Sequence, residues 1–189
     1  MVALMDQINN NNQEVIERAR ERVIETISLN MHLYGVTPSI GRLYGTLFFK
    51  DQPMTLDDMK DELQMSKTSM STSVRTLTDL NMVEKVWIKG QRKDQYEAKK
   101  DWYQIFFDYF THQWRKVIQV NLQAINQSLR ELEKLASDPS QLNVDESEEV
   151  NTTIEKLNYS KEYYAWLGQL FDQFESHEIF KYIKKPNEE

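Results

Sequence analysis

Residues 55–100 constrain the fold of this chain more than any other segment, because two short helical patterns come directly before two alternating ones. Thr55 and Asp58 have the spacing of a capping box, which predicts a short helix that ends near Leu63. Ser66 can cap a second helix after the turn. The apolar positions of this second helix have the spacing of a buried stripe: Met70, Val74, Leu77 and Leu80. The pattern predicts two packed helices joined by a tight turn.

An antiparallel hairpin is predicted directly after the second helix. Asn81 can take the left-handed position that ends the helix, and residues 83–89 then alternate as a strand. Residues 90–94 turn around Gly90, and residues 95–99 return as the second strand. The segment therefore predicts a winged helix-turn-helix domain.

The rest of the chain predicts long helices. Gly and Pro number only 5 and 4 among 189 residues, so few positions interrupt a helix. Helical periodicity covers residues 13–31, 38–50 and 101–135. A loop is expected around Asp138-Pro139 and the acidic run 145–149, before a further helix or pair of helices. The predicted fold class is mainly α with a small β-wing, a winged helix-turn-helix domain plus long dimerisation helices.

Five segments follow from this pattern. We expect a flexible N-terminal tail at 1–12, an N-terminal dimerisation helix at 13–36 and the winged DNA-binding domain at 37–100. A helical dimerisation and ligand-response region at 101–183 and a tail at 184–189 complete the chain. Apolar helices that flank a small domain favour a homodimer, with a monomer capped by a compact four-helix bundle as the alternative.

Composition excludes several classes of protein. The chain has no cysteine, so disulfides and thiolate metal sites are absent, and no apolar run reaches the length that spans a membrane. His32, His112 and His177 are isolated, and no glycine-rich phosphate loop or paired nucleophile and base is present. We therefore expect a cytoplasmic protein that is not an enzyme and needs no cofactor or metal.

Charge is distributed unevenly along the chain. The formal net charge is -7, but residues 66–100 carry eight basic and four acidic side chains, which gives +4, and the remainder carries 15 and 26, which gives -11. A basic segment in an acidic body suits a protein that meets DNA with one face. A chance excess of basic residues on a solvated face is the alternative.

The second helix of the predicted pair is rich in hydroxyl groups. Serine and threonine are poor residues for a helix interior, but their short side chains can bond phosphates or base edges. We predict a DNA-contacting face formed by Ser66, Lys67, Thr68, Ser69, Ser71, Thr72 and Arg75, together with the wing-tip residues Lys89, Arg92 and Lys93. The alternative is a winged-helix protein-interaction module that uses this face to bind protein without direct DNA contact.

Several motifs resemble a known family. The segments Gly41-Arg42-Leu43-Tyr44-Gly45-Thr46-Leu47, Met54-Thr55-Leu56-Asp57-Asp58-Met59, Leu63-Gln64-Met65-Ser66-Lys67-Thr68-Ser69-Met70-Ser71 and Gly90-Gln91-Arg92-Lys93 resemble the GbsR-type branch of the MarR-like winged-helix repressors. The likeness covers about residues 23–135. It implies a homodimeric repressor that binds double-stranded operator DNA and controls genes for glycine betaine synthesis or uptake of compatible solutes. It also implies a response to choline or a related quaternary amine.

Aromatic residues provide a candidate site for such a ligand. A trimethylammonium group has no N–H to donate, so the faces of aromatic rings recognise it best. We predict an aromatic box formed by Tyr44, Trp102, Tyr103, Phe106 and Phe110. The alternative is that these rings only pack in a hydrophobic core.

Overall fold

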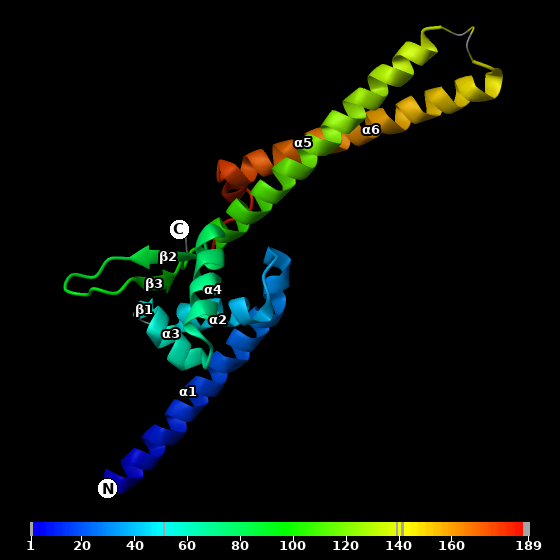
Figure 1. Ribbon diagram of the computed structural model, residues 1–189. Coiled ribbons are helices and arrows are strands. Elements are labelled where there is room, and N and C mark those ends of the chain that lie inside the picture. The colour runs from blue at the N-terminus through cyan, green and yellow to red at the C-terminus, as the bar shows by residue number, and fades with distance from the viewer. Residues whose placement is uncertain (1, 51, 139, 141, 187–189) are drawn as a thin grey trace. The chain divides into compact units, whose positions relative to one another are not determined.

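The computed structural model describes residues 2–50, 52–138, 140 and 142–186, and the side chains of residues 2–10 lie outside the description. The chain divides into two compact units, Met1–Ile105 and Phe106–Glu189 (Figure 1). Within the described residues, no helix combines the length and the hydropathy needed to cross a bilayer.

Two helices that approach closely open the first unit. Helix α1 spans Val2–Asn30, a 3-10 turn η1 follows at Met31–Tyr34, and α2 spans Pro38–Phe49. The Ser28 hydroxyl donates to the Pro38 carbonyl at 2.6 Å and so links the two helices. A Cβ atom added at Gly41 would lie 2.8 Å from the Cβ of Met31, so only glycine allows this approach.

The N-terminal segment differs from the prediction. Residues 2–12, assigned to a flexible tail, continue helix α1. The run Asn9 to Asn12 suggested a frayed segment, but asparagine costs only about 0.7 kcal/mol per residue relative to alanine, and the segment contains no glycine or proline. Gly35 ends the turn η1 with φ 71°.

The helix-turn-helix forms as predicted. Helix α3 spans Leu56–Leu63 and begins with the capping box between Thr55 and Asp58. Helix α4 spans Lys67–Asp79, and the Ser66 hydroxyl accepts from the backbone N–H of Ser69. Asn81 takes the predicted left-handed conformation, with φ 59°. Both helices therefore start where their capping side chains place them.

The wing belongs to a three-stranded sheet. Strands β2 (Val83–Val86) and β3 (Gln95–Ala98) pair antiparallel, with Lys85 opposite Tyr96. A two-residue strand β1, Met54–Thr55, pairs with the other edge of β3, so the order is β1-β3-β2. The sequence did not predict β1, because two residues carry no detectable periodicity. Strand β2 also ends earlier than the predicted residue 89.

One apolar core joins these elements. Its most deeply buried side chains come from α2, α3, α4 and the start of the wing, and they are Leu43, Met59, Met70, Leu77, Met82 and Val83. Ile105 of the next helix, α5, also packs into this core. The core fixes α4 and β2 relative to α3.

The second unit contains a helical hairpin. Helix α5 spans Trp102–Ala136 and starts in the first unit, α6 spans Val144–Glu175, and a 3-10 turn η3 lies at Glu178–Lys181. Figure 1 shows α5 and α6 running side by side. Ile118, Leu167 and Phe171 form their shared core. Arg115 on α5 pairs with Asp172 and with Glu175 of α6.

The acidic run 145–149 was expected in a loop, and this expectation is wrong, because the run lies in α6. The Asn143 side chain accepts a hydrogen bond from the backbone N–H of Glu146. The Glu146 carboxylate in turn accepts one from the backbone N–H of Asn143. Carboxylates in a first turn are favourable beside the positive end of the helix dipole. The segment after α5 forms one long helix, and the loop before it includes Pro139, which lies outside the described residues. The predicted tail 184–189 lies partly outside them as well.

The substitution Gly41→Ala tests the close approach of α1 and α2. Overpacking costs about 1–3 kcal/mol, while alanine recovers about 1 kcal/mol of helical propensity. We expect a net loss of up to about 2 kcal/mol in unfolding free energy, measured by urea denaturation. The matched control is Gly168→Ala, where an added Cβ meets nothing within 4 Å and should stabilise the protein. Equal effects of the two substitutions would contradict the packing described here.

Candidate functional site

Helix α4 has one buried and one exposed side. Met70, Val74 and Leu77 are buried, and Ser73, at 5% exposure, lies on the same side. The predicted DNA-contacting residues Ser66, Lys67, Thr68, Ser71, Thr72 and Arg75 are exposed, and Ser69 is half-buried. The hydroxyl groups predicted to contact DNA are therefore accessible to a partner.

Local hydrogen bonds arrange part of this exposed face. The hydroxyl groups of Ser66 and Ser69 lie 2.9 Å apart, and the Thr76 hydroxyl donates to the Thr72 carbonyl at 3.1 Å. The Thr76 hydroxyl therefore has its donor satisfied within its own helix. These contacts position three hydroxyl groups on or beside the exposed face.

The wing adds further exposed side chains. Lys89, Arg92 and Lys93 are exposed, and Gly90 takes φ 88° at the tip of the hairpin. Trp87, at 82% exposure, lies beside these cations. The sequence analysis missed Trp87, although a large aromatic residue in a predicted hairpin next to basic residues was a usable signal.

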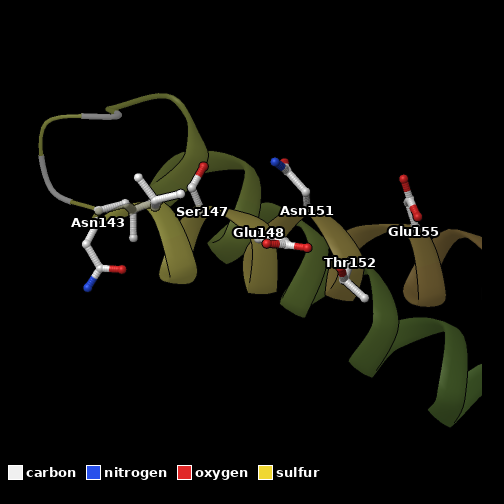
Figure 2. Close-up of a pocket in the computed structure, with 8 residues that line it drawn as sticks. Asn143, Ser147, Glu148, Asn151, Thr152 and Glu155 are labelled. Atoms are coloured by element: carbon white, nitrogen blue, oxygen red, sulfur yellow. The ribbon is translucent and has the colours of Figure 1, made fainter.

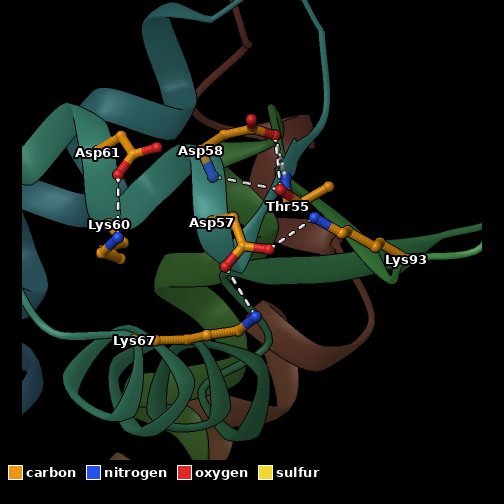
Figure 3. A network of polar contacts seen from close by, with 7 residues as sticks. All are labelled: Thr55, Asp57, Asp58, Lys60, Asp61, Lys67 and Lys93. Carbon is orange, nitrogen blue, oxygen red and sulfur yellow. Dashed lines mark hydrogen bonds and ion pairs between the residues drawn. The ribbon is translucent and has the colours of Figure 1, made fainter.

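A carboxylate of α3 connects the wing to α4 (Figure 3). Asp57, in the first turn of α3, accepts from Lys67 of α4 and from Lys93 of the wing, each at 2.7 Å. Hydrogen bonds from the two ammonium groups lower the pKa of Asp57 to about 2. The same carboxylate raises the pKa of Lys93. Asp57 therefore carries a full negative charge at neutral pH between two predicted DNA contacts.

A mainly apolar cavity of about 250 Å³ lies within the first unit. Three aromatic rings line it: Tyr34 of η1, Tyr44 of α2 and Trp102 of α5. The remaining lining residues come from α1, η1, the residue before β2 and the start of α5, and they are Thr26, Ile27, Asn30, Met31, Leu33, Met82 and Ile105. The volume lies just below the roughly 300–1,000 Å³ of pockets for drug-sized ligands, so the cavity suits a smaller molecule.

Tyr44 and Trp102 are held together in this cavity. Tyr44 is buried, and its burial raises the pKa of its hydroxyl above the ordinary value. Nearby Tyr34 adds to the increase, and a side-chain hydrogen bond with Trp102 opposes it. The indole N–H can only donate, so the Tyr44 oxygen accepts. The pair forms a fixed part of the wall.

The other predicted rings lie elsewhere. Tyr103, Phe106 and Phe110 are not among the residues that line this cavity. Phe106 and Phe110 belong to the second unit, where their ring centroids are 4.7 Å apart and Phe106 lies 6.3 Å from Phe174. The structure therefore brings Tyr44 and Trp102 together and adds Tyr34, which the sequence analysis did not name.

A second hollow lies at the start of α6. Figure 2 shows its polar side chains, including Asn143, Ser147 and Glu155, spread along the helix without converging on one point. In the part of the chain that the structure describes, no group of three His, Asp or Glu residues could hold a metal ion. This hollow offers no built site.

Comparison with known proteins identifies the family to which this chain belongs. The HTH-type transcriptional repressor GbsR of Bacillus subtilis (strain 168) is 44% identical over 168 residues, which are 89% of this chain and 92% of that protein. The chain belongs to the GbsR family of transcriptional regulators. A family model described as "GbsR family transcriptional regulator, C-terminal helical hairpin" matches residues 102–181, which contain α5 and α6. This agrees with the resemblance found in the sequence.

Two further comparisons extend the picture of this GbsR-family chain. The HTH-type transcriptional repressor OpcR of the same organism is 39% identical over 93% of this chain and 94% of its own. The crystal structure of a MarR family transcription regulator has 17% identity and a TM-score of 0.35, and covers 89% of this chain and 97% of its own. The GbsR-family chain is a transcriptional repressor, and the expectation that it is not an enzyme is confirmed by these relatives.

Replacing the Ser66 cap tests what holds the recognition helix in place. Ser66→Ala removes the acceptor for the Ser69 N–H, so the unfolding free energy should fall by about 1 kcal/mol in urea denaturation. The control is Ser71→Ala, an exposed position inside the helix, where alanine has the better propensity. A larger loss from Ser71→Ala than from Ser66→Ala would contradict the capping role.

Proposed function

We propose that this repressor binds operator DNA with the exposed face of α4 and the tip of the wing. The main support for this proposal is the exposure of its residues: six of the seven predicted at α4 and all three wing cations are exposed. The opposite side of α4 is buried. A helix that presents short hydroxyl groups can approach base edges, and Lys and Arg neutralise phosphates. The net charge of +4 in residues 66–100 supports the same assignment.

The ligand of this regulator is choline or a related quaternary amine. The cavity of about 250 Å³ supports this proposal, because Tyr34, Tyr44 and Trp102 present aromatic rings and the described lining contains no charged residue. Each ring that faces a trimethylammonium group contributes about 0.5–2 kcal/mol when water is excluded. Tyr103, Phe106 and Phe110 remain predicted members of the box.

Ligand binding can reach both units through one helix. Trp102 lies in the first turn of α5, which continues into the second unit. If a ligand binds more tightly when α5 is in one of two positions, it shifts the population toward that position. The size of the shift is the ratio of the ligand's affinities for the two positions. Operator affinity would change by the corresponding factor.

The regulator acts as a homodimer on palindromic sites. Two-fold DNA readers place two recognition helices one duplex turn, roughly 34 Å, apart. Exposed apolar side chains on α1 and α6 offer surface for a second copy: Val15, Ile16, Val23, Tyr159, Tyr163 and Trp166. By the family resemblance, the controlled genes serve glycine betaine synthesis or compatible-solute uptake.

Two substitutions test the DNA interface. On a duplex that the protein selects from a random pool, Arg75→Ala should weaken binding, and Lys93→Ala should reduce the salt slope by about 0.9, the value of one phosphate contact. Fluorescence anisotropy at several salt concentrations measures both. Lys161→Ala on α6 removes the same charge away from the interface and serves as control. Affinities that match the unsubstituted protein at every salt concentration would contradict the assignment.

Calorimetry with choline tests the aromatic cavity. Trp102→Ala should weaken choline binding roughly 2- to 30-fold, because one ring face is lost, while the uncharged isostere 3,3-dimethylbutanol should bind more weakly than choline to the unsubstituted protein. Tyr182→Ala removes an exposed aromatic ring that is not among the lining residues, and it should have little effect. Equal binding of the isostere and choline would refute a cation site.

A further inference from the structure

Asp57 is an acidic residue that lies between two predicted DNA contacts, Lys67 and Lys93. Its two carboxylate oxygens are each 2.7 Å from a lysine nitrogen, Oδ1 from Lys67 and Oδ2 from Lys93. The three residues come from the first turn of α3, the first turn of α4 and the wing (Figure 3). Two cations that the sequence separates by 26 positions thus converge on one anion.

The arrangement has the chemistry of a phosphate site. A phosphodiester presents two anionic oxygens on one atom, as a carboxylate does, and ammonium groups bind both as point charges. Two ammonium groups that span the oxygens of one carboxylate can therefore span those of one backbone phosphate. The side chains of Lys67 and Lys93 are 58% and 66% exposed, and Asp57 is 34% exposed, so the cluster is open to a large anion.

The remaining polar groups of α3 do not compete for this place. The Asp58 carboxylate accepts from both the backbone N–H and the hydroxyl of Thr55, at 2.8 and 2.7 Å. Asp61 pairs with Lys60 at 3.3 Å, one turn further along the helix. Among the acidic residues of α3, only Asp57 forms ion pairs with residues predicted to bind DNA, although the charge of Asp58 also contributes to the raised pKa of Lys93.

We propose that Lys67 and Lys93 form a joint site for a single DNA backbone phosphate, and that Asp57 is an internal competitor which occupies this site in the free protein. The inference rests on the proposed DNA-binding function and extends it. Binding then exchanges two ion pairs with a carboxylate for two with a phosphate. The released Asp57 carboxylate lies close to the incoming phosphate and repels it, so it lowers the affinity for any duplex.

This competition has a consequence for the balance between sequence-dependent and sequence-independent binding. Phosphate neutralisation supplies essentially all of non-specific DNA affinity. A carboxylate that reduces the affinity from phosphate neutralisation increases the share of the total affinity that comes from base contacts. The hydroxyl groups of α4 can make such contacts. Asp57 would thereby limit how much of the repressor is held on non-operator DNA.

The test compares Asp57→Asn with Asp61→Asn in the full chain. Each removes one negative charge from α3, but only the first releases Lys67 and Lys93. The probe is a duplex of arbitrary sequence, and fluorescence anisotropy at several salt concentrations gives the affinity and its salt slope. We expect Asp57→Asn to bind more tightly and to lose about 3- to 4-fold more affinity between 50 and 200 mM salt, the change expected when the net charge that faces the DNA rises by one. Asp61→Asn should change both quantities much less.

A second background shows whether the effect passes through the two lysines. In a Lys67→Ala/Lys93→Ala protein, adding Asp57→Asn should produce a much smaller gain, because only the repulsion between the carboxylate and the DNA is lifted and no cations remain to be released. Thermal unfolding of all variants verifies that α3 stays folded. A gain of undiminished size in this background, equal gains from Asp57→Asn and Asp61→Asn, or weaker binding by Asp57→Asn would each overturn the inference. If the unsubstituted protein shows no salt-dependent binding to any duplex, the proposed function itself fails.

Discussion

The one-sided burial of α4 determines most of what this protein can do. Met70, Val74 and Leu77 pack into a core shared with α2 and α3, so the opposite side of the helix must face solvent. The same core buries Met82 and Val83, which start the wing. Recognition helix and wing are therefore anchored by a single set of apolar contacts, and a cavity in that core would disturb both together.

Local signals in the sequence predicted the helix-turn-helix well. Thr55, Ser66 and Asn81 each act through neighbours three residues away or fewer, so their roles could be read directly from spacing. The predictions failed where propensity is weak or ambiguous. The asparagine run near the N-terminus does not end α1, and the acidic residues 145–149 serve α6 instead of a loop. Strand β1 is too short for any periodicity and depends on pairing with β3.

The site was predictable in part for the same reason. The exposed hydroxyl groups of α4 follow from its helical period, and the solvent-facing cations follow from their place at a hairpin tip. The Asp57 pairs and the cavity depend on contacts between distant parts of the chain, and spacing carries no information about them. Asp57 and Lys93 are 36 positions apart, and Tyr34 and Trp102, which both line the cavity, are 68 positions apart.

The hydrogen bond between Trp102 and Tyr44 has a thermodynamic consequence for any guest of the cavity. Tyr44 is also buried, so folding has already fixed its ring and an arriving molecule does not have to order it. The entropy cost of ordering one side chain, about 0.5–1.5 kcal/mol, therefore falls on folding and not on association. A small molecule with few atoms to contribute gains most from a wall that is fixed in this way.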